Sequence, residues 1–205
     1  MNEAGLGFRV KSGWAMVVLV SASSPPVVID RRRVELSDPA VPDSIQPFHA
    51  GLGLPKAAAA KAVARLVRCV ERSSERAIAE MIEHYRAGGH HIVGAGIVVG
   101  STVDPQTIKG DHIRAHAEEG RLFRVVIENA LKTSRLKSSV TREKDSIGEG
   151  RKMLGISEQK LRTELAKMGK AVEGSWRAEE KAATLAALMA LADWSRSRNW
   201  WLKEL

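Results

Sequence analysis

The sequence predicts an α/β fold, with a mixed sheet that begins in an N-terminal β-hairpin, helices on the faces of the sheet, and a helical C-terminus. Three observations predict it. β-branched runs dominate residues 1–36, later stretches repeat apolar side chains every three or four residues, and an apolar run at residues 91–99 separates two such stretches. With 205 residues, the chain can bury a substantial core without metals or disulfides.

We expect residues 1–205 to form a single α/β domain. Its expected parts are a β-hairpin over 1–36, a loop over 37–55, an α/β core over 55–152 and C-terminal helices over 153–205. The loop is predicted because its residues include four prolines and two glycines, which interrupt both helix and strand.

Within the N-terminal part, we expect strands at residues 8–10 and 14–20, with Gly13 in the turn between them. The sequence Ser-Ser-Pro-Pro at residues 23–26 signals a second turn. The run over 27–36 follows, and its partial alternation of polar and apolar side chains is typical of an edge strand.

A long helix is expected from Pro55, which suits a first helical turn, to the Gly88-Gly89 pair that ends it. Residues 91–99 predict a strand buried on both faces. A second amphipathic helix is expected over 111–132 and a short strand over 138–142.

The last third of the chain predicts two more helices. Ser157 and Glu158 open one that reaches Met168. The pair Gly174-Ser175 precedes a final helix of about twenty residues. The stretch 132–152, in contrast, is expected to be rich in loops.

The chain is basic, with a formal net charge of +8 and a pI of about 9.9, so its field attracts polyanions such as nucleic acid. Two groups of basic residues are candidates for phosphate contacts, and a solvated face is the alternative for both. The candidates are Arg31, Arg32 and Arg33 on the third run, and Lys132, Arg135, Lys137, Arg142 and Lys144 in the stretch 132–152.

A cytoplasmic location without a membrane partner is the expectation for this chain. Its single cysteine, Cys69, lies in a helical apolar pattern and is expected to be a buried hydrophobe, which a reducing cytoplasm allows. The apolar run 14–20 is too short to span a bilayer and is poorly placed for a signal peptide.

Two motifs raise the question of a cofactor or metal. The glycines 94, 96 and 100 resemble a dinucleotide-binding loop, but residues 101–105 (Ser-Thr-Val-Asp-Pro) cannot supply the helix N-terminus that such a loop needs, so we expect no cofactor. His112 and His116 lie one helical turn apart and could bind zinc, with Glu119, His90 and His91 as further candidate ligands. Ordinary helix-lining histidines are the alternative.

No nucleophile elbow, P-loop or Cys-x-x-Cys pair occurs in the sequence, so nucleophilic and redox catalysis have no signature here. The end of the chain concentrates Trp194, Trp200 and Trp201. Their indole rings either close over the protein's own core or form a contact patch, in which case a homodimer is the leading interpretation.

The order of elements resembles the ribonuclease H-like fold, and more narrowly its Holliday-junction resolvase branch. Residues 8–18 (FRVKSGWAMVV) are similar to that family's first strand, glycine turn and second strand, and residues 91–100 (HIVGAGIVVG) to its central parallel strand. The helix with residues 118–121 (EEGR) is similar to the one that follows, and the stretch 177–191 to the family's alanine-rich last helix.

The resemblance implies phosphodiester cleavage by carboxylates that hold two metal ions roughly 4 Å apart. This chain departs from that pattern. It has Val10 and Lys11 where the first strand should carry an aspartate, and no acid in the run 92–99; only Glu179 or Glu180 falls near the last acidic position. The departure implies that the metal-dependent nuclease activity is lost.

The expected function is therefore that of a non-catalytic binding domain, a pseudoenzyme on a degenerate nuclease-like scaffold, with nucleic acid or another polyanion as the first partner. Two alternatives stay open. One is an enzyme of unidentified chemistry with a metal at His112 and His116, and the other is a component of a protein–protein assembly.

Overall fold

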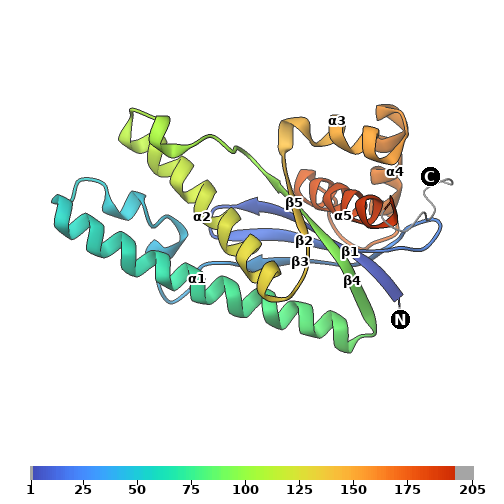
Figure 1. Ribbon diagram of the computed structural model, residues 1–205, viewed down its shortest axis with the longest axis horizontal. Helices are drawn as coiled ribbons and strands as arrows, with labels where there is room; N and C mark the ends of the chain where they lie inside the picture. The colour runs from blue at the N-terminus through green and yellow to red at the C-terminus, as the bar shows by residue number, and fades with distance from the viewer. Residues whose placement is uncertain (1, 197–205) are drawn as a thin grey trace.

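The computed structural model describes residues 2–196, which form a five-stranded mixed sheet with helices on both faces (Figure 1). The strand order is β3-β2-β1-β4-β5. The strands are β1 (Asn2–Lys11), β2 (Trp14–Ser21), β3 (Val28–Glu35), β4 (His90–Val99) and β5 (Ser138–Arg142). β1, β2 and β3 pair antiparallel, whereas β4 runs parallel to both β1 and β5. The carboxyl ends of β1, β4 and β5 therefore meet at one edge of the sheet, which we call the carboxyl edge.

The helices lie in two groups on opposite sides of this sheet (Figure 1). On one side are α1 (Lys56–Ala87) and α2 (Asp111–Thr133); on the other are α3 (Glu143–Leu154), α4 (Glu158–Lys170) and α5 (Ala178–Arg196). Three short 3-10 helices complete the elements: η1 (Pro42–Ile45), η2 (His49–Gly51) and η3 (Pro105–Thr107). No helix within residues 2–196 is long and apolar enough to cross a membrane.

The structure confirms the predicted α/β class and most of the predicted elements. The short strand predicted at 138–142 is β5, and the long helix ending at Gly88-Gly89 is α1. The glycine-containing run 91–99 lies within β4, a continuous strand between two neighbours, so it forms no strand-to-helix phosphate loop. Its burial on both faces follows from the helices on each side.

One prediction about the fold was wrong. The stretch 132–152 is not rich in loops, because most of it belongs to the end of α2, to β5 and to α3. Gly148 and Gly150 lower the helix propensity of α3 and hide it from a sequence pattern. Gly150 packs closely against α5, since a Cβ there would lie 2.6 Å from Cδ1 of Leu185, and that side chain would have to shift. Glu143 and Asp145 in the first turn favour the N-terminus of α3.

The sheet and α5 touch backbone to backbone over a floor of glycines. Gly7 of β1 and Gly96 of β4 are direct neighbours in the sheet register. A Cβ on Gly7 would lie 1.8 Å from the carbonyl oxygen of Ala183, and one on Gly96 would lie 2.2 Å from that of Ala186. A Cβ on Gly5 would lie 2.6 Å from the carbonyl oxygen of Ala187, which is also too close. No side chain larger than hydrogen fits at these positions, so we call Gly5, Gly7 and Gly96 the glycine floor.

Replacement of Gly7 by alanine should therefore destabilise the protein strongly. The added methyl group must push the α5 backbone away from the sheet, at a cost of at least about 2 kcal/mol in the free energy of unfolding. That cost corresponds to a Tm lowered by about 4 °C or more in a chain of this size. Thermal and urea unfolding followed by circular dichroism measure it.

Gly94 on β4 provides the matched control. A Cβ there would be 3.7 Å from its nearest neighbour, the carbonyl oxygen of Lys137, which is ordinary contact. Gly94→Ala should leave stability unchanged or slightly raised, because alanine restricts the unfolded chain. Equal destabilisation by both substitutions would contradict the assigned role of the glycine floor.

Candidate functional site

A cavity of about 280 Å³ opens at the carboxyl edge, between the ends of β1 and β4 and the N-terminal half of α2. We call it the basic pocket, because its charged lining consists of Arg9, Lys11, Arg121 and Arg124. Hydroxyl groups of Ser12, Ser101 and Thr102 also line it, together with the ring of His116. No carboxylate is among the described residues that line it.

Arg9 is a buried cation, with only 4% of its surface exposed. Its Nε and Nη2 donate to the two carboxylate oxygens of Glu143, at 3.1 and 2.5 Å, and its Nη1 donates to the Val10 carbonyl. Two parallel bonds from one guanidinium to one carboxylate are the strongest ion-pair geometry that proteins use. The Glu143 side chain is 45% exposed, so water still solvates the acidic partner.

Lys11, the last residue of β1, pairs with the first turn of α5. Its Nζ lies 3.3 Å from Glu179 Oε1. The backbone N–H of Glu179 and the Lys11 ammonium hold the pKa of the Glu179 carboxyl below its ordinary value, against the smaller opposing effect of burial. Glu143 and Glu179 are therefore both paired with basic side chains of β1.

Arg121 and Arg124 reach the pocket from α2. Ala117 and Gly120 lie on the same face of α2 as these arginines, and their small size leaves room for the pocket. Arg121 is exposed. Arg124 is only half-buried, and its Nε is 3.5 Å from Glu128 Oε2 without a hydrogen-bond partner among the described residues.

The three arginines predicted to contact phosphate on β3 all have partners within the chain. Arg31 donates to the carbonyl groups of Ser175 and Glu173 and lies 3.3 Å from Glu180. It thereby ties the edge strand to the segment that precedes α5.

Arg32 and Arg33 are paired more locally. Arg32 donates to Asp30 at 2.6 Å and lies over the Tyr85 ring. Burial opposes ionisation of Asp30, but the hydrogen bonds from Tyr85 and Arg32 outweigh it and hold the pKa of Asp30 below its ordinary value. Arg33 donates to Glu35 and stacks over the Trp14 ring. A role of these side chains in nucleic-acid contact stays a prediction.

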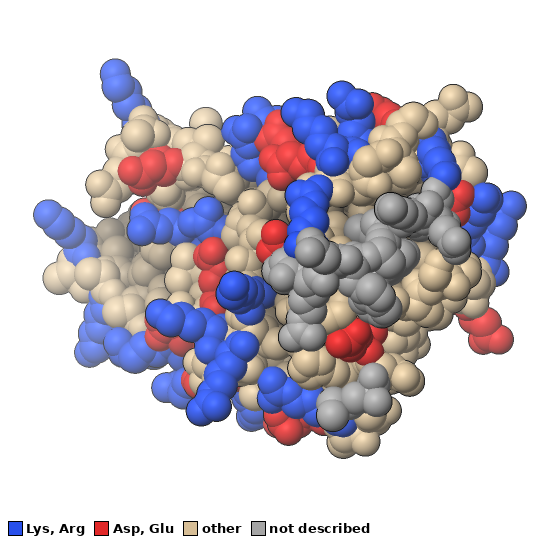
Figure 2. Space-filling view, turned by 45° about the vertical axis from the view of Figure 1, so that its right-hand side comes forward, with Lys and Arg blue, Asp and Glu red and all other residues tan. Residues whose placement is uncertain are grey.

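The second predicted basic group is divided between two ends of the sheet. Lys132, Arg135 and Lys137 lie around the turn from α2 into β5, beside a wider hollow of about 1060 Å³ that Trp194 also lines. Arg142 and Lys144 lie at the other end of β5, at the carboxyl edge. Figure 2 shows that on the face it presents, Lys and Arg side chains are spread among acidic ones rather than gathered in one patch.

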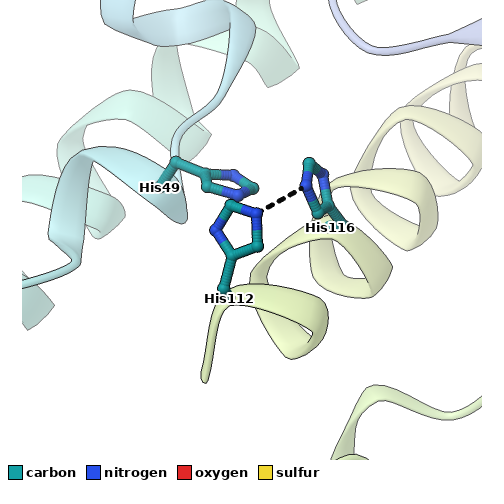
Figure 3. Close-up of side chains that lie close together, drawn as sticks. All are labelled: His49, His112 and His116. Atoms are coloured by element: carbon teal, nitrogen blue, oxygen red, sulfur yellow. Dashed lines mark hydrogen bonds between the residues drawn. The ribbon is translucent and has the colours of Figure 1, made fainter. Parts of the chain in front are cut away.

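A third histidine, from a segment distant in the sequence, lies beside the predicted pair His112 and His116. His112 and His116 lie on the first two turns of α2, with their Nε2 atoms 3.2 Å apart, and His49 of η2 faces both (Figure 3). The potential ligand atoms of the three rings all lie within 4.8 Å of one another. Within residues 2–196 this is the one group of three or more histidine, cysteine or acidic side chains close enough to share a metal ion.

The other candidate ligands have different positions. Glu119 lies on the same helix, fully buried, and contacts His49. His90 and His91 begin β4, at the end of the strand away from the carboxyl edge, and are not members of the group.

Sequence reasoning missed several residues of this region. Arg121 and Arg124 follow Ala117 and Gly120 at steps of three and four residues, which places all four on one face of a helix. This spacing could have indicated a basic helix face beside small residues. Arg9 lies between the apolar residues Phe8 and Val10 in a buried strand, and a buried arginine needs an acidic partner. The sequence could therefore predict that Arg9 is paired, but not that Glu143 is the partner. His49 had no signal, because it lies in the proline-rich segment, 70 positions from Glu119.

Of the three tryptophans predicted to form an interface, one is described. Trp194 is half-buried on α5 beside the wider hollow. Trp200 and Trp201 lie outside the described residues. The homodimer stays a prediction.

Comparison with known proteins identifies the fold. The sequence matches no protein-family model and no curated protein. Two solved structures of Thermus thermophilus RuvC are similar, one of them in complex with a Holliday junction substrate. Each has a TM-score of 0.52 and 10% sequence identity, over 97% of this chain and 96% or 97% of its own. The chain therefore has the ribonuclease H-like fold of these RuvC structures.

Proposed function

We propose that this protein binds nucleic acid through the basic pocket and does not cleave it by the two-metal chemistry of resolvases. The observation that carries the proposal is the lining of that pocket: four basic side chains, three hydroxyl groups and no carboxylate among the described residues. Arginine, lysine and hydroxyl groups are the side chains that contact phosphate oxygens. One of the similar structures, a RuvC, is in complex with a Holliday junction.

The loss of cleavage follows from the charges at the carboxyl edge. Two-metal hydrolysis needs several carboxylate oxygens that converge on a pair of cations. Here β1 ends in Arg9 and Lys11, and the nearby acids Glu143 and Glu179 are engaged with these two side chains. These basic side chains would repel a divalent cation at this edge, whereas they and the hydroxyl groups of the pocket would attract a phosphate group.

The binding proposal predicts a salt-dependent affinity for DNA that depends on α2. The full chain should bind a fluorescent four-way junction in an anisotropy titration, with an affinity that falls steeply as NaCl increases. The double variant Arg121→Gln/Arg124→Gln should bind at least roughly tenfold more weakly, because it removes two charge-assisted contacts. Its log–log salt slope should fall by up to about 2.

Arg162→Gln is the matched control, since Arg162 is an exposed arginine on α4 whose partner is Glu158. Its affinity should equal that of the parent chain. The triple variant Lys132→Gln/Arg135→Gln/Lys137→Gln tests the wider hollow in the same titration. Failure to bind any DNA at low salt, or a loss confined to the triple variant, would remove the basic pocket from the proposal.

The Arg9–Glu143 pair predicts opposite effects on stability and binding. Glu143→Gln leaves a buried guanidinium without its counter-charge and should lower the free energy of unfolding by about 1–2 kcal/mol, a value reduced because Glu143 is half-exposed. Arg9→Met leaves a solvated carboxylate and should cost less. Arg9→Met should weaken DNA binding, however, whereas Glu143→Gln should strengthen it. Urea unfolding and anisotropy measure the two effects, and the reverse ranking in both would contradict the proposal.

Absence of cleavage is the last expectation. Incubation of the junction with the full chain and Mg²⁺ or Mn²⁺ should give no product on a denaturing gel, because Glu143 and Glu179, the acids beside the end of β1, are paired with basic side chains. Divalent-ion-dependent cleavage that Glu179→Gln abolishes would show that these acids do bind metal, and would return the protein to the hydrolases.

A further inference from the structure

We propose that His49, His112 and His116 form a binding site for a single zinc ion, held in orientation by the buried carboxylate of Glu119. The site does not depend on the nucleic-acid proposal. It joins two segments distant in sequence, the 3-10 helix η2 and the N-terminal turns of α2, at the rim of the basic pocket (Figure 3).

The spacing of the rings suits tetrahedral zinc. Zn–N bonds of 2.0–2.1 Å place adjacent ligand nitrogens about 3.3 Å apart in a tetrahedron. The Nε2 atoms of His112 and His116 are 3.2 Å apart. The ring centroid of His49 lies 4.8 Å from that of His112 and 4.3 Å from that of His116. In the structure His112 and His116 share a hydrogen bond, and the ring of His49 contacts both, so the three imidazoles already lie around one position where an ion could replace that bond.

Glu119 determines which nitrogen of His49 is free. Its Oε1 accepts from the His49 backbone N–H at 3.2 Å and lies 2.8 Å from the ring Nδ1. With Oε1 as the acceptor of both contacts, the ring proton of His49 would be on Nδ1 and the lone pair on Nε2. That Nε2 is buried and has no hydrogen-bond partner among the described residues. A carboxylate that holds a ligand histidine in this tautomer is the usual second partner at zinc sites.

The second carboxylate oxygen of Glu119 also supports a cation site here. Glu119 is fully buried, and its Oε2 has no hydrogen-bond partner in the part of the chain described here. It lies 3.9 Å from Nδ1 of His116. One buried carboxylate therefore faces two of the three histidines, and it would stabilise a cation bound between their rings.

The donor set selects the class of metal. Three imidazole nitrogens disfavour Mg²⁺ and Ca²⁺, which prefer oxygen ligands, and favour zinc and its neighbours in the transition series. Three protein ligands leave a fourth position for water or an anion, which is the arrangement of zinc sites that meet a ligand rather than of closed structural sites. Since His116 also lines the basic pocket, the ion would add positive charge to its rim.

Zinc titration of the untagged full chain, purified without immobilised metal and stripped with a chelator, tests the site. Competition with a chromogenic zinc indicator should show one ion per chain, and elemental analysis should confirm it. Co²⁺ in place of zinc should give the intense visible absorption of a tetrahedral complex. Bound zinc should also raise Tm, because it binds the folded chain.

Single substitutions assign the ligands. His112→Ala and His116→Ala change exposed side chains and should leave the circular dichroism spectrum unchanged while they weaken zinc binding at least 100-fold. Glu119→Gln should weaken it about 10- to 100-fold, as removal of an outer partner does. His91→Ala is the control, an exposed histidine outside the group, and should bind zinc as the parent chain does.

Each result decides for or against the site. Stoichiometric zinc that His112→Ala abolishes and His91→Ala retains would support it, whether or not the protein binds DNA. Zinc binding that survives both His112→Ala and His116→Ala, or weak binding lowered equally by His91→Ala, would mean adventitious binding and overturn it. Tight binding of Cu²⁺ or Ni²⁺ without zinc would overturn the choice of metal.

Discussion

The contact between the glycine floor and α5 is the constraint on which the arrangement of this protein depends. Gly5, Gly7 and Gly96 carry no side chains, so the α5 backbone lies directly against β1 and β4. α5 is alanine-rich and buried on nearly every side, enclosed by the sheet and by α3 and α4. Any larger residue in this layer would lift the helix and with it the acids of its first turn.

The position of that first turn decides the chemistry of the carboxyl edge. Because α5 lies so close to β1, Glu179 reaches Lys11, and the buried Glu180 reaches Arg31 of the edge strand. Glu143, in the first turn of α3, likewise pairs with Arg9 of β1. Glu143 and Glu179 thus lie near the end of β1 but are engaged in ion pairs with it. Across the pocket, Arg121 of α2 has no ion-pair partner within residues 2–196.

The basic pocket and the histidine group share one helix but offer different chemical groups. Both use the N-terminal half of α2, the pocket through the face with Ala117 and Gly120, and the histidine group through His112 and His116. His116 belongs to both. A phosphate group in the pocket and a metal ion at the histidines would therefore lie close to each other, and each would favour the other through opposite charge.

The sequence by itself determined the order and type of nearly all elements, because periodicity and turn residues act between near neighbours. β5 and the end of α1 at Gly88-Gly89 are examples. It indicated the departure at Lys11 and the pair His112 and His116. It did not indicate α3, whose two glycines lower its helix propensity. Only the tertiary structure decided what these groups contact: Arg9 meets Glu143 across 134 positions, and His49 meets Glu119 across 70. Such pairs depend on how the sheet and helices pack, and no local pattern encodes that.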